Sequence, residues 1–360
     1  MHLSKKIIFS TGGTGGHILP AVHLMKHFFE KGYEVLIVTD VRGNKFLEEY
    51  PEFKSYVLPA DTTTNKNFVN KILALKSILY SIIKSFFILK KERPNLIFGL
   101  GGYASFPISI ASRFFKLPLV LYENNLILGR ANKFLLTFSK KVLLAKEMNN
   151  NFPQKYKQKT SIVGAVLSKK ILNPILVQNN KNNFFSIIVL GGSQGAEEFG
   201  NIIPTVINKL KNQGYSIKIS QQCTNNQKKN IENFYKKNNI KNYVFGFEKN
   251  IYNLILSSDL AITRCGASTT AELVHALTPF IAVPLPNSID NHQYLNAKYY
   301  EEKDCCWVLE QSNFNTESLF NLIMETIKNK YKLEKIRENM KKHLNKNVYN
   351  DIEKEIESLI

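Results

Sequence analysis

A glycine-rich segment that ends in a histidine contains the first residues that could do chemistry. Its members are Gly12, Gly13, Gly15, Gly16 and His17. Residues 6–9 before it predict a short buried strand, and residues 21–29 after it predict a helix with Pro20 in its first turn. Free N–H groups at a helix N-terminus attract anions, and glycine lets a ligand approach the backbone. The segment therefore predicts an anion site beside an imidazole that exchanges a proton near neutral pH, with a plain tight turn as the alternative.

This segment differs from the two common phosphate-binding fingerprints. Starting at Gly13, the pattern G-x-G-x-x-G requires a glycine at position 18, where Ile18 stands. Asp40 ends the next strand, where a dehydrogenase would carry its ribose-binding acid, so that class stays open as a distant alternative. The pattern G-x-x-x-x-G-K-[ST] is absent from the sequence.

The chain has the length and composition of a globular protein with two domains. It contains 360 residues, of which 44% are hydrophobic and 21% are charged. A net charge of +19 is compatible with an anionic substrate, an anionic membrane surface or nucleic acid. No zinc-knuckle spacing and no basic ribonucleoprotein motif with interleaved aromatics occurs, so we expect no nucleic acid partner.

Cysteine usage and the apolar runs predict a reduced compartment without a membrane span. The cysteines Cys223, Cys265, Cys305 and Cys306 form no C-x-x-C pair, which is typical of a cytosolic protein. Residues 1–4 lead directly into the first strand, so we expect no signal peptide. No uncharged apolar run reaches the length of a transmembrane helix.

Strands and helices alternate along the chain, which predicts parallel sheets covered by helices on both faces. In the first half, further strands are expected at residues 34–39, 95–99 and 118–122. In the second half they are expected at residues 184–190, 215–220, 242–245, 260–263 and 279–283. Because a strand–glycine–helix turn opens each half, we expect an α/β protein with two similar domains that face each other.

One long stretch, residues 67–91, predicts a helix that is both apolar and basic. Its apolar residues at helical spacing are Phe68, Ile72, Leu75, Leu79, Ile82, Phe86 and Leu89. One interpretation is a core helix with solvated lysines. The other is a helix that dips one face into an anionic bilayer, where each nearby lysine adds roughly 1 kcal/mol.

Polar residues follow the expected strands where parallel strands end together at one edge of a sheet. In the first half these are the turn that contains Gly102, Tyr103 and Ser105, and the segment from Glu123 to Asn125. In the second half, Arg264 ends a strand and Ser268 begins a helix, so N–H groups and hydroxyls there could hold a diphosphate. An ordinary helix cap is the alternative for Ser268. Three side chains could bind ribose or sugar hydroxyls: Glu272, Gln293 and Asn296.

Six segments together resemble the motifs of the MurG family of peptidoglycan glycosyltransferases, glycosyltransferase family 28. In chain order they read TGGTGGHILPA, GLGGYASFP, YENNLILGRANKF, LGGSQGA, RCGASTTAEL and DNHQYLNA. They occur in the order of the family and span residues 10–297. The resemblance implies a GT-B fold, in which two Rossmann-like domains face each other across a cleft.

The resemblance also implies a reaction. This is the inverting transfer of N-acetylglucosamine from UDP-N-acetylglucosamine to the 4-hydroxyl of the N-acetylmuramoyl group of lipid I, an undecaprenyl-linked acceptor, giving lipid II. It implies no cofactor and no essential metal, and the sequence contains no Asp-x-Asp pair to clamp one. A peripheral protein at the cytoplasmic face of the cell membrane is expected.

The site residues follow from the matching motif positions. On the donor side they are Thr14, Gly15, Gly16, Asn125, Ser193, Arg264, Ser268, Thr269, Glu272 and Gln293, and on the acceptor side Gly102, Tyr103 and Ser105. An inverting transfer needs a general base, for which His17 is the first candidate and Glu123 the second. His17 has the alternative of capping its own turn or binding phosphate.

Two departures from the family pattern stand out. Tyr122 replaces the usual histidine before the glutamate of the third motif. Residues 164–168 read GAVLS where Gly-Asn-Pro-Val-Arg is expected, so Ser168 stands in place of an arginine that contacts the donor phosphate. Lys169 or Lys170 could supply the missing charge.

The expected domains are an acceptor and membrane-associating domain at 1–164, a UDP-sugar domain at 165–335 and a helical tail at 336–360 that could pack back on the first domain. A different GT-B glycosyltransferase and a non-catalytic nucleotide-sugar-binding module are the rival interpretations.

Overall fold

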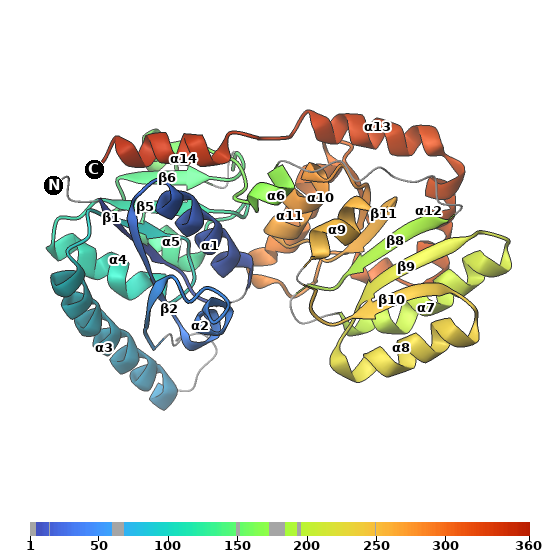
Figure 1. Cartoon of the computed structure of the whole chain (residues 1–360), viewed down its shortest axis with the longest axis horizontal. Helices are drawn as coiled ribbons and strands as arrows, with labels where there is room; N and C mark the ends of the chain where they lie inside the picture. The colour runs from blue at the N-terminus through green and yellow to red at the C-terminus, as the bar shows by residue number, and fades with distance from the viewer. Residues whose placement is uncertain are drawn as a thin grey trace. The chain divides into compact units, whose positions relative to one another are not determined.

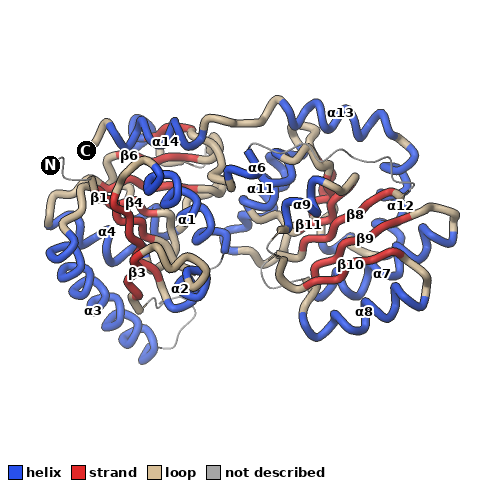
Figure 2. The backbone as a smooth tube through the Cα atoms, in the orientation of Figure 1, coloured by secondary structure: helices blue, strands red, loops and turns tan. Residues whose placement is uncertain are grey.

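The computed structural model describes residues 5–13, 15–59, 68–148, 152–172, 184–192, 196–248 and 250–360. The chain forms two compact units (Figure 1). The first unit is Met1–Ser168 together with Asn345–Ile360, and the second is Lys169–Leu344. Each unit contains one parallel β-sheet that helices cover (Figure 2).

The first unit is built on a seven-stranded sheet with the order β3-β2-β1-β4-β5-β6-β7. Every strand pairing in it is parallel. Its central strands are buried on both faces, which explains their unbroken apolar sequences. The strands are β1 (Lys6–Ser10), β2 (Glu34–Thr39), β3 (Lys54–Val57), β4 (Leu96–Gly99), β5 (Leu119–Glu123), β6 (Lys141–Leu144) and β7 (Thr160–Ile162).

The helices of this unit connect successive strands, except the last, which returns from the C-terminal end of the chain. They are α1 (Gly15–Glu30), α2 (Val41–Leu47), α3 (Phe68–Glu92), α4 (Ser105–Phe114), α5 (Arg130–Leu135), the 3-10 helix η2 (Gln154–Lys159) and α14 (Val348–Glu357).

Helix α1 begins earlier than the sequence predicts, at Gly15 and not at residue 21. Pro20 therefore lies inside the helix and not in its first turn. Because proline has no N–H, the usual helical hydrogen bond from residue 20 to the Gly16 carbonyl is missing. His17 consequently lies in the first turn of α1, and its ring position is set by a helix.

The second unit contains a six-stranded parallel sheet with the order β10-β9-β8-β11-β12-β13. The strands are β8 (Phe185–Leu190), β9 (Ile217–Gln222), β10 (Lys241–Phe245), β11 (Leu260–Thr263), β12 (Phe280–Ala282) and β13 (Cys306–Val308). The helices are α6 (Lys169–Leu172), α7 (Glu197–Asn212), α8 (Asn225–Lys237), α9 (Ile251–Leu256), α10 (Ala267–His275), α11 (His292–Glu301), α12 (Thr316–Lys328) and α13 (Lys330–Lys341), with 3-10 turns η3 (Ile289–Asn291) and η4 (Gln311–Asn313).

The two parallel-sheet α/β domains that the sequence predicts are confirmed. All the strands expected from the sequence are present, with shifts of one or two residues at their ends. The structure adds β3, β6, β7 and β13, which the sequence did not predict. Three of these, β3, β7 and β13, are edge strands with half-exposed residues, so they lack the apolar signal of the central strands.

The C-terminal tail consists of two helices that belong to different units. Helix α13 packs in the second unit, where Ile336 and Met340 join the core, so residues 336–344 lie there. Helix α14 packs on the first unit, where Glu353 Oε2 lies 3.1 Å from His27 Nε2 and Glu355 Oε2 lies 2.7 Å from Lys141 Nζ. Residues 345–360 thus complete the first unit.

We predict that Ile352→Ala destabilises the protein by about 2–5 kcal/mol, because Ile352 is fully buried on α14 and the smaller side chain leaves a cavity. Denaturant or thermal unfolding measures the loss. Lys354→Ala, an exposed position on the same helix, is the matched control and should leave stability nearly unchanged. Equal stability of both variants would contradict the docking of α14.

Candidate functional site

The two glycine turns of the first unit pack directly against each other at the carboxyl edge of the sheet. Gly102 has a φ of +78°, and a Cβ built on it would lie 2.9 Å from the carbonyl oxygen of Gly12. No L side chain fits there. Ser105 Oγ donates to the Gly102 carbonyl at 2.8 Å and fixes the turn, while Tyr103 is half-buried beside it. These contacts bring the ends of β1 and β4 together.

His17 contacts the second of these turns. Its Nδ1 lies 3.1 Å from the carbonyl oxygen of Leu100. A carbonyl oxygen can only accept, so Nδ1 carries the hydrogen and neutral Nε2 holds a lone pair. Within the described part of the chain no residue hydrogen-bonds Nε2, and the ring is half-buried. This is the arrangement that a general base needs.

The carboxylate of Glu123, the other candidate base, accepts hydrogen bonds from residues that follow it in the chain. The side chain is 3% exposed at the end of β5. Oε1 accepts from the backbone N and Nδ2 of Asn125 at 3.1 and 3.2 Å. Oε2 accepts from Gly129 N at 2.9 Å and from Asn132 Nδ2 at 3.0 Å. Four donors occupy both oxygens, which favours an anchoring role for this carboxylate over proton abstraction.

The carboxylate of Asp40 also accepts hydrogen bonds from nearby protein groups. It accepts from Gly13 N at 3.0 Å, Gly43 N at 2.7 Å and the Arg42 guanidinium at 3.0 Å. The side chain caps α2 and holds the glycine segment, so it is not placed as a free ribose-binding acid. This removes the feature that kept a dehydrogenase open.

Tyr122 and the segment 164–168, the two departures from the family pattern, contact each other. Tyr122 is buried, and its hydroxyl donates to the carbonyl of Gly164 at 3.1 Å and accepts from Val166 N at 2.9 Å. Burial raises the pKa of Tyr122 well above its ordinary value, so the hydroxyl stays protonated. Lys169 and Lys170 are exposed at the start of α6, and Ser168 is half-buried.

In the second unit, the N-terminus of α10 follows directly from the end of β11. Gly266 is the N-cap residue and provides no side-chain hydrogen bond, so the first N–H groups of the helix lack a side-chain cap. Ser268 and Thr269 lie half-buried in this first turn. The geometry matches the predicted diphosphate position, because the helix dipole and these N–H groups favour an anion.

Glu272 lies one turn further along α10. It is half-buried, and none of the described residues hydrogen-bonds its carboxylate. Desolvation raises the pKa of Glu272 to about 7. A carboxylate without donors is ready to accept hydroxyl hydrogens from a ligand, as the ribose prediction requires.

Gln293 on α11 has its amide orientation fixed by the backbone. Its Oε1 accepts from Cys265 N and from Leu285 N, both at 3.1 Å. The amide hydrogens on Nε2 are therefore the groups that remain for a ligand. Asn296 differs, because it is fully buried and donates to the Cys265 carbonyl at 3.1 Å. It holds the loop and does not reach a sugar.

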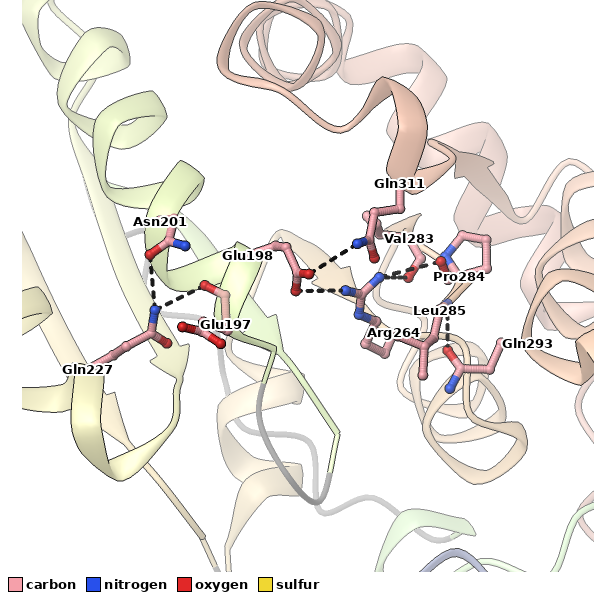
Figure 3. A network of polar contacts seen from close by, with 10 residues as sticks. All are labelled: Glu197, Glu198, Asn201, Gln227, Arg264, Val283, Pro284, Leu285, Gln293 and Gln311. Carbon is pink, nitrogen blue, oxygen red and sulfur yellow. Dashed lines mark hydrogen bonds and ion pairs between the residues drawn. The ribbon is translucent and has the colours of Figure 1, made fainter. Parts of the chain in front are cut away.

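The guanidinium of Arg264 is held by hydrogen bonds and an ion pair with other residues of the second unit (Figure 3). It is 5% exposed, and its Nη1 donates to the carbonyls of Val283 and Pro284 at 3.1 and 3.4 Å. Its Nη2 lies 3.4 Å from Glu198 Oε2, and Gln311 Nε2 donates to the other oxygen of Glu198 at 3.1 Å. The arginine thus ties together the loops that border the predicted donor site.

Two predicted donor residues, Thr14 and Ser193, lie outside the described residues, whereas Gly15 and Gly16 open α1. Among the residues that the structure does describe, no group of three or more His, Cys, Asp or Glu side chains could hold a metal ion. Sequence reasoning missed the Leu100 carbonyl, Asn132 and Glu198. A backbone carbonyl leaves no signal in a sequence. Asn132 lies inside the third motif without a distinct role, and Glu198 lies just after the fourth motif.

Helix α3 exposes many large apolar side chains, although one side of it is buried. Ile88 and Leu89 join the core, and Ala74, Ser81 and Ser85 are buried as well. Ser81 Oγ donates to the Pro59 carbonyl at 2.9 Å. Its exposed positions form what we call the α3 face: Leu73, Leu75, Leu79, Tyr80, Ile83, Phe86 and Phe87, which are 36–69% exposed. The helix lies on the outside of the unit beside α4 (Figure 1). A contiguous apolar surface of this kind marks an interaction site.

Polar contacts hold α3 in this orientation. Glu92 at its end lies 2.6 Å from Lys54 Nζ and 3.3 Å from Lys6 Nζ, and it accepts from Tyr56 at 2.5 Å. Burial alone would raise the pKa of Glu92, but these hydrogen bonds lower it to about 2. No helix of the described residues is long and apolar enough to cross a membrane.

We predict that Glu272→Gln raises thermal stability in the absence of ligand at pH 8. The pKa of Glu272 is about 7 in the folded state and lower when unfolded, so the native protein loses stability as the pH rises from about 4.5 to 7. The variant lacks this loss, so the gain in Tm should be absent near pH 4.5 and reach a few degrees above pH 7. Glu302→Gln, an exposed position, should show no such trend.

Comparison with known proteins finds one family model in each half of the chain. Residues 7–144 match the glycosyltransferase family 28 N-terminal domain, and residues 186–356 match the C-terminal domain of the same family. The chain is 34% identical over 360 residues to the UDP-N-acetylglucosamine--N-acetylmuramyl-(pentapeptide) pyrophosphoryl-undecaprenol N-acetylglucosamine transferase of Pelagibacter ubique, with 99% of both chains covered. It is 35% identical to the protein of that name from Rickettsia felis, covering 94% of this chain and 95% of the relative.

A solved structure gives the same result. The crystal structure of MurG from Acinetobacter baumannii superposes with a TM-score of 0.81 at 25% identity, covering 98% of this chain and 99% of that one. The family that the six motifs predict is confirmed, and the fold is GT-B. The chain therefore belongs to glycosyltransferase family 28.

Proposed function

We propose that this chain transfers N-acetylglucosamine from UDP-N-acetylglucosamine to the 4-hydroxyl of the N-acetylmuramoyl group of lipid I, forming lipid II for peptidoglycan synthesis. The names of its full-length relatives support this reaction. The proposal depends mainly on one observation: a candidate general base and a candidate donor-binding site occur in the same chain. Among the described residues, the half-buried imidazole in the first unit has no partner at Nε2. In the second unit, the N-terminus of α10 has no side-chain cap and lies one turn from a carboxylate that no described residue hydrogen-bonds.

In this proposal the second unit binds the donor. The N–H groups at the start of α10 and the side chains of Ser268 and Thr269 bind the diphosphate. The Glu272 carboxylate accepts hydrogen bonds from the two ribose hydroxyls, and the amide hydrogens of Gln293 donate to sugar hydroxyls. Oriented N–H groups then stabilise the charge that develops on the leaving UDP, which is the task of a metal ion in other transferases.

The first unit activates the acceptor. His17 Nε2 accepts the proton of the 4-hydroxyl as its oxygen attacks the anomeric carbon, and the bond between that carbon and the UDP oxygen breaks. One displacement inverts the anomeric configuration. Glu123 holds the loop after β5 in place, and the glycine turn that contains Gly102, Tyr103 and Ser105 lies beside the acceptor.

The α3 face supports a peripheral position at the cytoplasmic face of the cell membrane, where a lipid-linked acceptor is reached. Apolar side chains on this face can enter the bilayer, since they are 36–69% exposed, whereas Ile88 and Leu89 of the same helix join the core. Exposed basic residues flank it and suit anionic lipid headgroups: Lys76, Lys90, Lys91, Arg113 and Lys116.

The reaction is tested by transfer of radiolabelled N-acetylglucosamine from UDP-N-acetylglucosamine to a lipid I analogue with EDTA present. We expect lipid II formation by the native chain and a fall of about 10²–10⁴-fold in kcat for His17→Ala, because the general base is lost. Binding of UDP-N-acetylglucosamine, measured by calorimetry, should persist in that variant. Donor binding without any product from the native chain would instead indicate a non-catalytic nucleotide-sugar-binding module.

Membrane association is tested with the double variant Leu79→Ser, Phe87→Ser. Loss of two large apolar groups that are 58% and 69% exposed should weaken binding to phosphatidylglycerol vesicles by about tenfold or more. Vesicle flotation measures the bound fraction. The matched control is Tyr331→Ser, an aromatic residue that is 79% exposed in the second unit, and it should bind as the native chain does. Equal binding of the double variant would contradict the role of the α3 face.

A further inference from the structure

We propose that Glu198 is a positioning residue for recognition of the donor sugar. It acts on the amide of Gln293 through the Arg264 guanidinium and one backbone peptide, all of which are drawn in Figure 3. The inference rests on the proposed contact between Gln293 and the sugar, which it extends to a residue outside the six motifs. Each link from Glu198 to Gln293 is a hydrogen bond or an ion pair of the structure.

The first link is an ion pair between a buried cation and a partly exposed anion. Arg264 is 5% exposed, and its Nη2 lies 3.4 Å from Glu198 Oε2. Burial lowers the pKa of the Arg264 guanidinium and the charge of Glu198 raises it, so this carboxylate offsets part of the cost of burying the cation. Among the residues that the structure describes, no other carboxylate forms an ion pair with Arg264.

The Glu198 carboxylate is itself held in place. Its Oε1 accepts from Gln311 Nε2 at 3.1 Å, and Glu198 lies in the first turn of α7, where the helix dipole favours a negative charge. The ring of Phe199, the next residue, lies with its centroid 4.8 Å from Arg264 Cζ. Two consecutive residues of α7 thus contact the guanidinium and fix its position.

The second link runs from Arg264 to the loop after β12. Its Nη1 donates to the carbonyl oxygens of Val283 and Pro284 at 3.1 and 3.4 Å. The Pro284 carbonyl and the Leu285 N–H belong to the same planar peptide group, so holding the oxygen fixes the direction of the hydrogen. Since proline has no N–H, Leu285 provides the one backbone donor of residues 284–286.

The third link joins this peptide to Gln293. Gln293 Oε1 accepts from Leu285 N and from Cys265 N, each at 3.1 Å. A single hydrogen bond lets a side-chain amide pivot about it, whereas two donors hold both the oxygen and the plane of the amide. The Leu285 N–H therefore determines where the Nε2 hydrogens point, and these are the hydrogens proposed to bind sugar hydroxyls.

Removal of the Glu198 charge has a defined consequence along these links. A buried guanidinium without an anion is costly, so we expect Arg264 to turn toward solvent and to release the two carbonyls. The Leu285 N–H then loses its fixed direction, and Gln293 Oε1 keeps only the hydrogen bond from Cys265. An ion pair that only stabilised the second unit would contribute little, since the Glu198 side chain is 48% exposed, and its loss would leave sugar binding unchanged.

The loop is observed directly by hydrogen exchange of the Leu285 amide, measured by NMR of the full-length chain labelled with ¹⁵N-leucine and assigned by the loss of its signal in Leu285→Ile. We expect this amide to exchange several-fold faster in Glu198→Ala than in the native chain, because its hydrogen bond opens more often. Glu197→Ala is the matched control, since this carboxylate is exposed in the same turn of α7 and the ion pair of Arg264 does not include it.

Donor recognition is measured by calorimetry with UDP-N-acetylglucosamine and with UDP, which lacks the sugar. We expect Glu198→Ala to weaken binding of UDP-N-acetylglucosamine by about three- to tenfold, the loss of one sugar hydrogen bond, and to leave binding of UDP nearly unchanged. Glu198→Gln, which removes the charge at nearly constant size, should act in the same direction. Because Glu198 acts through Gln293, adding Glu198→Ala to Gln293→Ala should weaken binding no further.

Native affinity for UDP-N-acetylglucosamine in both folded Glu198 variants, or an unchanged exchange rate of the Leu285 amide, would overturn the inference and leave the proposed transfer reaction standing. Equal weakening of UDP binding, or additive effects in the double variant, would overturn it as well, because Glu198 would then act on the whole donor site or by another route. Native affinity in Gln293→Ala would contradict the proposed sugar contact itself, and with it this inference. Lipid II formation by the native chain tests the reaction independently of these variants.

Discussion

The first unit depends on the contact between two glycine backbones. A Cβ on Gly102 would lie 2.9 Å from the Gly12 carbonyl oxygen, so the two turns pack too closely for a side chain at this position. The contact lies beyond the carboxyl ends of the paired strands β1 and β4, near the start of α1. Because α1 begins at Gly15, His17 lies in the first turn of a helix, and its Nδ1 donates to the Leu100 carbonyl. The helix and this hydrogen bond together give the imidazole the fixed geometry that proton transfer requires.

The carboxylates near the two sheet edges are distinguished by their hydrogen-bond donors. Asp40 accepts hydrogen bonds from three protein donors and Glu123 from four, and these donors stabilise the charge of each carboxylate within the protein. Glu272 has no such donors among the described residues, and desolvation raises its pKa to about 7. A carboxylate that is costly to keep charged in the empty protein gains most when ligand hydroxyls arrive. We therefore propose that Glu272, and not Asp40 or Glu123, is the carboxylate that binds ligand hydroxyls.

Helix α3 leaves a set of apolar side chains exposed. Its polar contacts, among them Ser81 with Pro59 and Glu92 with Lys54, lie on the buried side, while the apolar α3 face stays outside. Apolar side chains exposed in this way gain no burial in water, and we propose that this face contacts lipid. The buried carboxylate of Glu92 with its three partners fixes the rotation of the helix about its axis, and with it the direction of that face.

The sequence alone determined the α/β class, the two domains, the family and the strands that are apolar on both sides, because these follow from local periodicity and motif order. It did not predict the edge strands, the early start of α1 or the separation of α13 from α14. The tertiary structure alone decided which predicted site residues are free. Arg264, Asn296 and Glu123 have the right chemistry for ligands, but packing supplies each with protein partners. It also decided the direction of the α3 face, since that helix is apolar on nearly every side, and hydrogen-bond partners come from residues far apart in the chain.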